Sequence, residues 1–217
     1  GVTAPGRDLL RSVTTAWPGA GVLRDAQQFV APLALAEAVG FGVVVARAMN
    51  PGSFGTSGTR ARPAGLDRPG VAHRALHRSE RRLLVPMIRR SDSVAATRVR
   101  DIIGPGAVRA LARRAGMRRF HYNPVWGLSP TSPRDQARFM DHFDRFVVPR
   151  HRSFARHQLA YIVPSQRWGV GRLRLPGWRL YFKGGWGSGS GAVDHQVAFR
   201  ESGDARIALA IFTQADG

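Results

Sequence analysis

The sequence predicts an α/β or α+β fold, in which an antiparallel sheet formed largely by a C-terminal meander packs against a helical region. Apolar residues recur at helical spacing between about residues 79 and 162. After Pro176 they alternate with polar residues, as in half-buried strands, and glycine-rich segments separate the alternating stretches. Helices followed by a run of strands favour helices segregated on an antiparallel sheet.

Length and composition indicate a single domain over residues 1–217. Hydrophobic residues make up 43% of the chain and aromatic residues 9%, which is enough to build a packed core. Cysteine is absent, so disulfides, thiolate metal ligands and cysteine nucleophiles are excluded.

The chain carries a formal net charge of +19, and every cationic side chain except Lys183 is arginine. A charge of this size attracts nucleic acids, acidic polymers and anionic membranes. The arginines are spread along the whole chain and accompany no recognisable nucleic-acid-binding motif, so we expect no specific nucleic-acid partner. The single lysine marks a position that needs a compact ammonium group rather than a planar guanidinium.

The periodic spacing of apolar residues is weakest in the N-terminal third of the chain. We expect an amphipathic helix over 7–17 and a buried core helix within the apolar stretch 29–46. Pro32, Glu37 and two glycines interrupt this stretch, so we expect no membrane span. Residues 50–70 are rich in Gly, Pro, Ser and Arg and predict an irregular connection.

Helices are expected to begin near Ser79, Val94, Ala107, Ser132 and Arg152. A Gly-Pro-Gly sequence at 104–106 separates the second from the third. The clearest start is Ser132, because Pro133 follows at the first helical position and Asp135 three residues after the serine. Strands are expected at 178–182, 192–200 and 206–212, joined by a glycine-rich segment and a turn at 201–204.

Two short motifs carry side chains capable of chemistry. Ser91 precedes Asp92 in a connection between two helices, and Lys183 lies at the end of a strand, followed by Gly184 and Gly185. A hydroxyl that faces a lysine across a cleft forms a proton-shuttling pair, and the glycines leave room for a substrate backbone. Each motif alone is also common in helix caps and strand ends without a function.

Together these motifs resemble those of the serine hydrolase superfamily that contains class A β-lactamases and penicillin-binding proteins. Residues 87–96 resemble its Ser-Asp-Asn motif, with Ser93 in place of the asparagine. Residues 182–186 resemble its Lys-Thr-Gly motif, and the segments 131–135 and 163–169 match it as well. The resemblance implies a β-lactamase/transpeptidase-like fold.

The resemblance covers about 75–217, so residues 1–74 are expected to be an atypical or abbreviated N-terminal part. It implies an acyl-transfer site, with no metal or cofactor, for a small-molecule or peptide substrate that carries a carboxylate. An extracytoplasmic location is also implied. The oligomeric state is left open.

The resemblance also assigns roles. Ser91 would relay protons, Lys183 would hold the substrate carboxylate, and the backbone N–H of Trp186 would stabilise an oxyanion. Further substrate contacts would come from Asp92, Ser93, Gly184 and Gly185.

The catalytic pattern is nevertheless incomplete. The superfamily's nucleophile is a serine followed three residues later by a lysine, and no such motif occurs in this chain. The alignment of the apolar stretch places Gln27 and Val30 at those two positions, and neither can act as nucleophile or base. No Asp or Glu occurs between Gly116 and Thr131, where class A enzymes carry the base that hydrolyses the acyl-enzyme. We therefore expect impaired acyl transfer.

Three functional hypotheses follow. The first is a β-lactamase-like serine hydrolase with impaired acyl transfer. The second is a non-catalytic binding module for cell-wall peptides or anionic polymers, and the third is a nucleic-acid binder. Two other constellations are weaker: a metal pair at His73 and His77, and a triad of Asp194, His195 and a serine at 188 or 190. Neighbouring strand residues point to opposite faces, which argues against the triad.

Overall fold

The computed structural model describes residues 29–31, 74–187 and 193–214. Its helices are α2 (Arg78–Arg90), α3 (Ser93–Arg114), α4 (Pro133–Asp141), α5 (Phe143–Phe146) and α6 (Arg152–Ala160). Its strands are β1 (Phe29–Ala31), β2 (Ser129–Thr131), β3 (Arg179–Gly187), β4 (Val193–Ser202) and β5 (Ala205–Gln214). Four 3-10 turns are η1 (Trp126–Leu128), η2 (Pro149–His151), η3 (Pro164–Gln166) and η4 (Gly169–Gly171).

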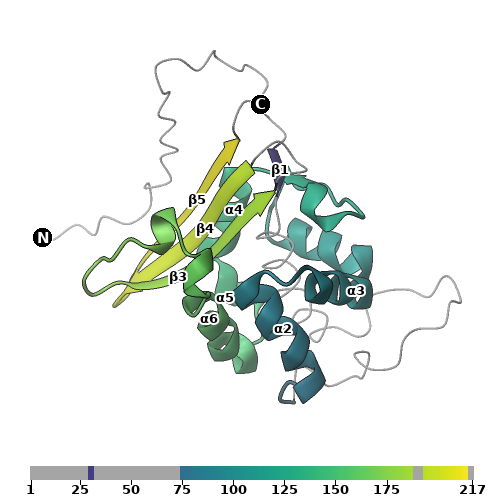
Figure 1. The fold of residues 1–217 in the computed structure, drawn as a ribbon, viewed down its shortest axis with the longest axis horizontal. Coiled ribbons are helices and arrows are strands. Elements are labelled where there is room, and N and C mark those ends of the chain that lie inside the picture. The colour runs from purple at the N-terminus through teal and green to yellow at the C-terminus, as the bar shows by residue number, and fades with distance from the viewer. Residues whose placement is uncertain (1–28, 32–73, 188–192, 215–217) are drawn as a thin grey trace, which may run out of the picture.

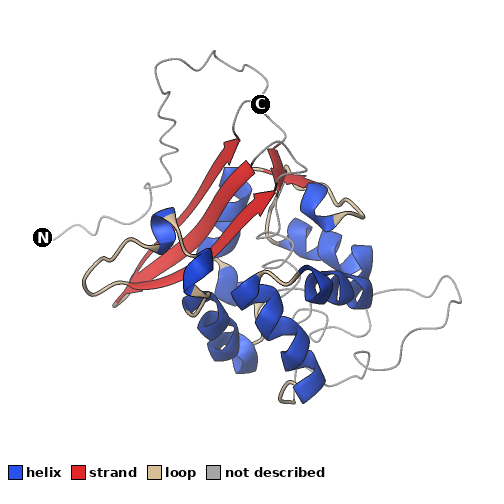
Figure 2. Ribbon diagram, viewed as in Figure 1, coloured by secondary structure: helices blue, strands red, loops and turns tan. Residues whose placement is uncertain are grey.

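The last three strands form the predicted meander (Figures 1 and 2). They pair antiparallel in the order β3-β4-β5, and Lys183 lies opposite Val197. Gly203 makes the turn between β4 and β5 with φ +54°, a conformation that favours glycine. The α+β fold class with an antiparallel C-terminal sheet is therefore confirmed.

Helices cover the sheet and join it to the rest of the core. α4 packs against β4 and β5, α6 packs against β3, and α2 contacts both α3 and α6 (Figure 1). Aromatic rings fill the layer between helices and sheet: Phe143 lies 6.1 Å from Phe139 and 5.8 Å from Phe199, measured between centroids. All three rings are buried, so this contact fixes the helices on the sheet that carries Lys183.

The helix signals near the middle of the chain are mostly confirmed. Ser132 accepts a hydrogen bond from the N–H of Asp135 and caps α4 as predicted. α2 begins one residue earlier than predicted, because the carboxylate of Glu80 accepts the N–H of His77 at 2.6 Å. The predicted break at 104–106 is a kink within α3, where Gly104 has φ 71° and ψ 163°.

Two predictions of secondary structure are wrong. Phe29–Ala31 form the short strand β1, which pairs with β2, and are not part of the predicted helix over 29–46. Strand pairing supplies partners for the backbone of these residues that an isolated apolar pattern cannot reveal. Lys183 lies in the middle of β3 rather than at its end, because β3 continues to Gly187 opposite Val193. The predicted helix over 7–17 and connection over 50–70 lie outside the described residues.

An ion-pair network ties the helices to the far end of the sheet. Arg156 on α6 contacts Asp144 at 2.6 Å and Glu201 at 2.8 Å. Arg206 on β5 contacts Asp144 at 2.8 Å, and its guanidinium lies 4.0 Å from the ring centroid of Phe199. Two arginines and two carboxylates thus neutralise one another above the aromatic core.

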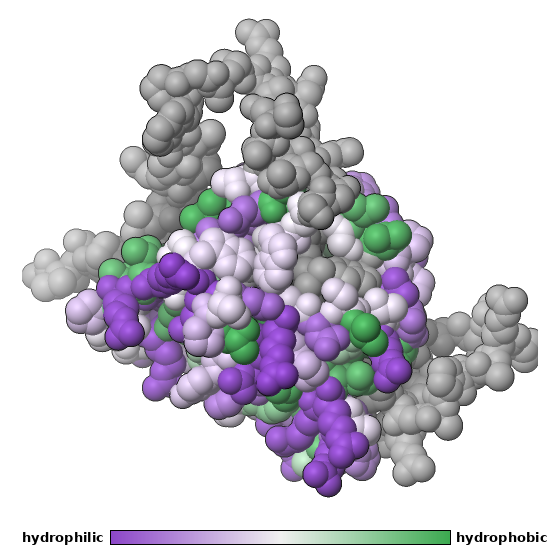
Figure 3. Space-filling model, viewed as in Figure 1, coloured by the Kyte–Doolittle hydropathy of each residue, from purple (hydrophilic) through white to green (hydrophobic). Residues whose placement is uncertain are grey.

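The surface is mainly hydrophilic on the face seen in Figure 3, with hydrophobic residues scattered among charged ones. Among the described residues, no helix combines the length and the apolar character needed to cross a bilayer.

Candidate functional site

Ser91 is held at the junction of two helices. It ends α2 in the left-handed conformation, with φ 52° and ψ 46°, and its N–H donates to the carbonyl of Pro86. Asp92 then caps α3, because its carboxylate accepts the N–H of Ala95 at 2.8 Å. A non-glycine residue with positive φ is strained, so the two helices on either side hold Ser91 in place.

Lys183 reaches Ser91 from β3 across 92 positions of sequence. Its Nζ donates hydrogen bonds to Oγ of Ser91 and to the carbonyl of Gly184, each at 2.6 Å. Both side chains are buried, with 1% of Lys183 and 8% of Ser91 exposed. A buried ammonium needs such partners, so the single lysine of the chain and this serine form one unit.

Gln166 determines the direction of the Ser91 hydroxyl. Its Nε2 donates to the carbonyl of Arg90 at 2.6 Å, and its Oε1 accepts from Oγ of Ser91 at 2.9 Å. A flipped amide would set two acceptors, Oε1 and the Arg90 carbonyl, against each other. Ser91 therefore donates its proton to Gln166 and accepts from Lys183.

The segment that carries Gln166 is anchored at its start. The N–H of Val163 donates to the carbonyl of Arg89 at 3.0 Å, and Nε of Arg89 donates to the carbonyl of Tyr161 at 2.7 Å. These two bonds join the chain after α6 to the last turn of α2. They place Gln166 next to Ser91 although 75 positions separate the two.

Two tryptophans lie beside the pair: Trp186 on β3, and Trp168 in the segment between η3 and η4. Trp168 packs on Gly184, and its Nε1 donates to Oδ1 of Asp194 at 2.6 Å. Its ring meets that of Trp186 edge-on at a centroid distance of 5.5 Å. Nζ of Lys183 lies 5.9 Å from the centroid of the Trp186 ring. Trp168 thus fills the space over Gly184, and the sequence-based prediction that a substrate backbone lies there is wrong.

The other predicted site residues lie nearby with different environments. Gly185 is buried within β3, next to Trp186, which is 44% exposed. Ser93 is exposed at the first position of α3, and among the described residues no hydrogen bond joins it to Ser91 or Lys183. The carboxylate of Asp92 serves as the helix cap. The structure therefore brings Ser91, Lys183, Gly184 and Trp186 together, and it leaves Ser93 at the margin.

A comparison with family models decides where this arrangement belongs. The model of the β-lactamase enzyme family matches residues 69–217, more than two thirds of the chain. The chain belongs to the β-lactamase enzyme family. The resemblance seen in the sequence motifs is thereby confirmed.

Solved β-lactamases share the fold. The structure is similar to the β-lactamase from Desulfarculus baarsii, with a TM-score of 0.62 at 20% identity over 89% of this chain and 77% of that one. It is also similar to the β-lactamase from Sphaerobacter thermophilus, with a TM-score of 0.63 at 21% identity over 87% and 75% of the two chains. The chromosome-encoded β-lactamase of Vibrio parahaemolyticus gives 0.63 at 16% identity over 89% and 79%. Among curated proteins, none matches this chain.

In this member of the β-lactamase family, the alternative sites are not assembled by the described residues. Asp194 is exposed and bonded to Trp168, whereas His195 is buried and stacked on Phe212 at 4.2 Å, so the two face opposite sides of β4 as predicted. Both serines of the proposed triad, Ser188 and Ser190, lie outside the described residues, as do His73 and Gln27. No group of three potential metal ligands occurs in the described ranges.

Sequence reasoning missed the roles of Gln166, Trp168 and Asp194. Gln166 and Trp168 belong to the segment 163–169, which was identified only by its resemblance to the superfamily. The available signal was the composition of this segment, in which Gln166 and Trp168 lie close together between a proline and a glycine. Nothing in the sequence pairs them with residues on α2 or β4.

Proposed function

We propose that this protein binds β-lactam or peptidoglycan-type amides that carry a carboxylate, as a β-lactamase-like serine hydrolase with impaired acyl transfer. The observation that carries the proposal is the 2.6 Å hydrogen bond from Nζ of Lys183 to Oγ of Ser91. It joins Ser91 and Lys183, which the resemblance assigns to the family's second and third motifs, in one buried pair. The same family supports an extracytoplasmic location, where cell-wall amides occur.

The buried ammonium is the source of affinity in this proposal. A ligand carboxylate that accepts a hydrogen bond near Ser91 lies close to the charge of Lys183, in surroundings less polar than water. The Ser91 hydroxyl must leave Gln166 before it can donate to such a ligand, because its single proton is engaged there. Binding therefore includes a rotation of the Ser91 side chain.

Impaired acyl transfer rests on the missing catalytic motif. The chain has one lysine, and Lys183 is not preceded by a serine at the third position before it, which is Leu180. Val30 lies in strand β1 rather than in a helix, so the alignment that gave it the position of the catalytic lysine does not hold, and the chain offers no other lysine as the base. Binding can thus persist where turnover is lost.

Intact-mass spectrometry after incubation with a fluorescent penicillin tests the proposal, together with the equilibrium affinity for the same compound. We expect binding that is at least tenfold weaker in Ser91→Ala and Lys183→Ala, with little covalent adduct in any variant. Ser153→Ala serves as the control, since Ser153 is an exposed serine on α6 that the resemblance does not assign to the site. Rapid acylation of the parent would overturn the impairment, and affinity unchanged in both variants would overturn the site.

A further inference from the structure

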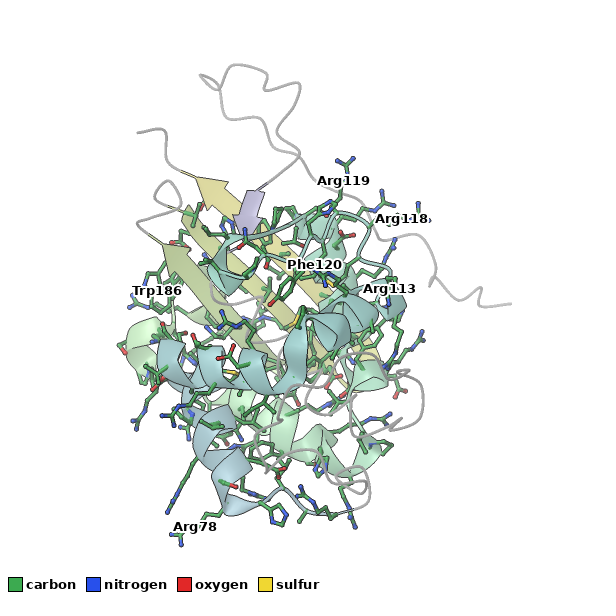
Figure 4. The ribbon with its side chains drawn as sticks, turned by 90° about the vertical axis from the view of Figure 1, so that its right-hand side faces the viewer. Arg78, Arg113, Arg118, Arg119, Phe120 and Trp186 are labelled. Atoms are coloured by element: carbon green, nitrogen blue, oxygen red, sulfur yellow. The ribbon has the colours of Figure 1, made fainter. Side chains whose placement is uncertain are left out.

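Exposed arginines gather where α3 ends and where α4 begins. Between Asp101 and Asp135 the sequence has no acidic residue. The same stretch has six arginines, all exposed, which we call the arginine surface: Arg109, Arg113, Arg114, Arg118, Arg119 and Arg134. Figure 4 shows Arg113, Arg118 and Arg119 pointing outward on one side of the molecule, with Trp186 on the opposite side. The arginine surface therefore lies away from the Ser91–Lys183 pair, which is next to Trp186.

The turn that ends α3 holds the middle of this surface together. Gly116 has φ +66° and reverses the chain, and its N–H donates to the carbonyl of Arg113 at 3.0 Å. Met117 is buried, so the turn is anchored in the core and Arg118 follows on the outside. Nη1 of Arg138 donates to the carbonyl of Gly116 at 3.2 Å and adds a further guanidinium to the turn.

Contacts on either side of the turn extend the surface into a stripe. The N–H of Arg119 donates to Oδ2 of Asp135 at 2.7 Å, which places Arg119 beside Arg134 at the start of α4. On the other side, Arg109 precedes Arg113 by one helical turn, about 6 Å along the axis of α3. The stripe thus runs along the end of α3, across the turn and onto α4.

The fold leaves much of this charge without a carboxylate. Among the residues that the structure describes, no ion pair involves Arg113, Arg114 or Arg118. Asp135 is buried and accepts the backbone N–H of Arg119. Arginines in the last turn of a helix offset its dipole, which accounts for Arg113 and Arg114. The dipole does not account for Arg118, because α3 ends at Arg114. A polyanion would relieve the repulsion between these like charges.

The chemistry of the stripe selects among polyanions. A guanidinium binds phosphate through two parallel hydrogen bonds, so a row of arginines suits a chain of phosphates. Single-stranded nucleic acids also require free rings for base stacking, but Phe120 packs against the core and Tyr122 lies beneath Arg109, 4.8 Å from its guanidinium. Peripheral membrane binding gains from apolar side chains that insert, whereas Ala115 and Met117, between these arginines, are buried. A phosphodiester chain without bases fits best.

We propose that the arginine surface binds a linear polyol-phosphate polymer of the cell wall. The polymer would hold the protein by this side and leave the opposite side, with Ser91 and Lys183, free for its own ligand. The interaction uses none of the residues of the proposed function, so either proposal can fail without the other.

Fluorescence anisotropy with labelled poly(glycerol phosphate) tests the proposal between about 50 and 200 mM salt. The surface variant replaces three of the arginines: Arg113→Gln, Arg114→Gln and Arg118→Gln. The control variant removes the same net charge at exposed arginines on α2 and in the loop before β3: Arg78→Gln, Arg82→Gln and Arg174→Gln. Circular dichroism establishes that both variants are folded.

We expect the surface variant to bind the polymer at least roughly tenfold more weakly than the parent at the lower salt concentration. The slope of log K against log salt should become shallower by about 2, since each lost phosphate contact releases about 0.7 fewer counterions. The control variant should lose less than about threefold, because charges beyond a Debye length of about 8 Å are largely screened. Penicillin affinity should be the same in all three proteins.

Equal losses in the two variants would overturn the arginine surface and leave only an effect of net charge. No binding of the polymer by the parent would also overturn the proposal. A DNA duplex and vesicles of phosphatidylglycerol and phosphatidylcholine serve as competing partners. Tighter binding of the parent to either of these, lost in the surface variant alone, would reassign the surface to nucleic acid or to a membrane and overturn the polymer as its partner.

Discussion

Trp168 lies directly against Gly184, so closely that a Cβ atom at position 184 would overlap the indole ring. The ring cannot move aside without breaking its hydrogen bond to Asp194. Glycine at this position of β3 is therefore a packing requirement, and the same contact holds the segment 164–168 over the site.

Gly184→Ala should accordingly destabilise the protein by about 1–3 kcal/mol, the usual cost of overpacking. Urea denaturation measures it. Gly106→Ala is the matched control, because a Cβ there meets nothing within 4 Å and alanine favours the helix. Equal effects of the two substitutions would refute the packing argument. Adding Trp168→Ala to Gly184→Ala should recover part of the loss.

Backbone strain at Ser91 can be separated from the loss of its hydroxyl. Both Ser91→Ala and Ser91→Gly leave Lys183 without its Oγ acceptor, but only glycine adopts φ 52° at little cost. We expect the glycine variant to be more stable than the alanine variant by about 1 kcal/mol in chemical denaturation. If the alanine variant is as stable as the glycine variant, the backbone at position 91 is not strained.

Asp144 should make stability depend on pH. Burial by itself would raise the pKa of Asp144, but hydrogen bonds from Arg156 and Arg206 outweigh it and lower the pKa. The carboxylate therefore stabilises the fold above its unfolded pKa of about 4, and this contribution is lost as the pH falls through the lower folded pKa.

Asp144→Asn tests this directly, with an expected loss of about 2 kcal/mol at pH 7 from the charged hydrogen bonds. The difference from the parent should shrink as the pH is lowered from 5 toward 3, the range that spans the usual carboxyl pKa of about 4. Asp101→Asn, which removes an exposed acid paired with Arg100 on the surface, should change stability by less than about 0.5 kcal/mol throughout. A difference between parent and Asp144→Asn that is constant with pH would contradict the argument.

Glu80 ties down the start of α2. Its carboxylate receives Arg74 at 2.8 Å and the N–H of His77 at 2.6 Å, and it is 3% exposed. Glu80→Ala should cost about 2 kcal/mol, since it removes the cap and leaves the Arg74 guanidinium without this partner. Hydrogen exchange should rise in the first turn of α2 but not in α4. Unaltered exchange in the first turn of α2 would show that the Glu80 cap does not stabilise this turn.

Local signals predicted most of the helices and strands because their causes are local. Ser132, Pro133 and Asp135 specify the start of α4 within four residues, and the turn at Gly203 needs only the positive φ that glycine adopts readily. The alternation of 192–200 and 206–212 predicted β4 and β5 because one face of each strand must be buried. Where partners are distant, the local pattern predicts wrongly: it favours a helix where β1 forms, and it ends the first C-terminal strand at 182, whereas β3 continues to Gly187.

By itself the sequence determined the α+β fold, the family motifs and the absence of a Ser-x-x-Lys nucleophile, because residue identity and short-range spacing specify these features. Only the tertiary structure decided that Ser91 donates to Gln166 while Lys183 donates to Ser91, and that Trp168 rather than a substrate fills the space over Gly184. These contacts join residues from 16 to 92 positions apart. They depend on how the helices pack on the sheet. This packing is set by burial and hydrogen bonding across the whole domain, and no single segment of the sequence encodes it.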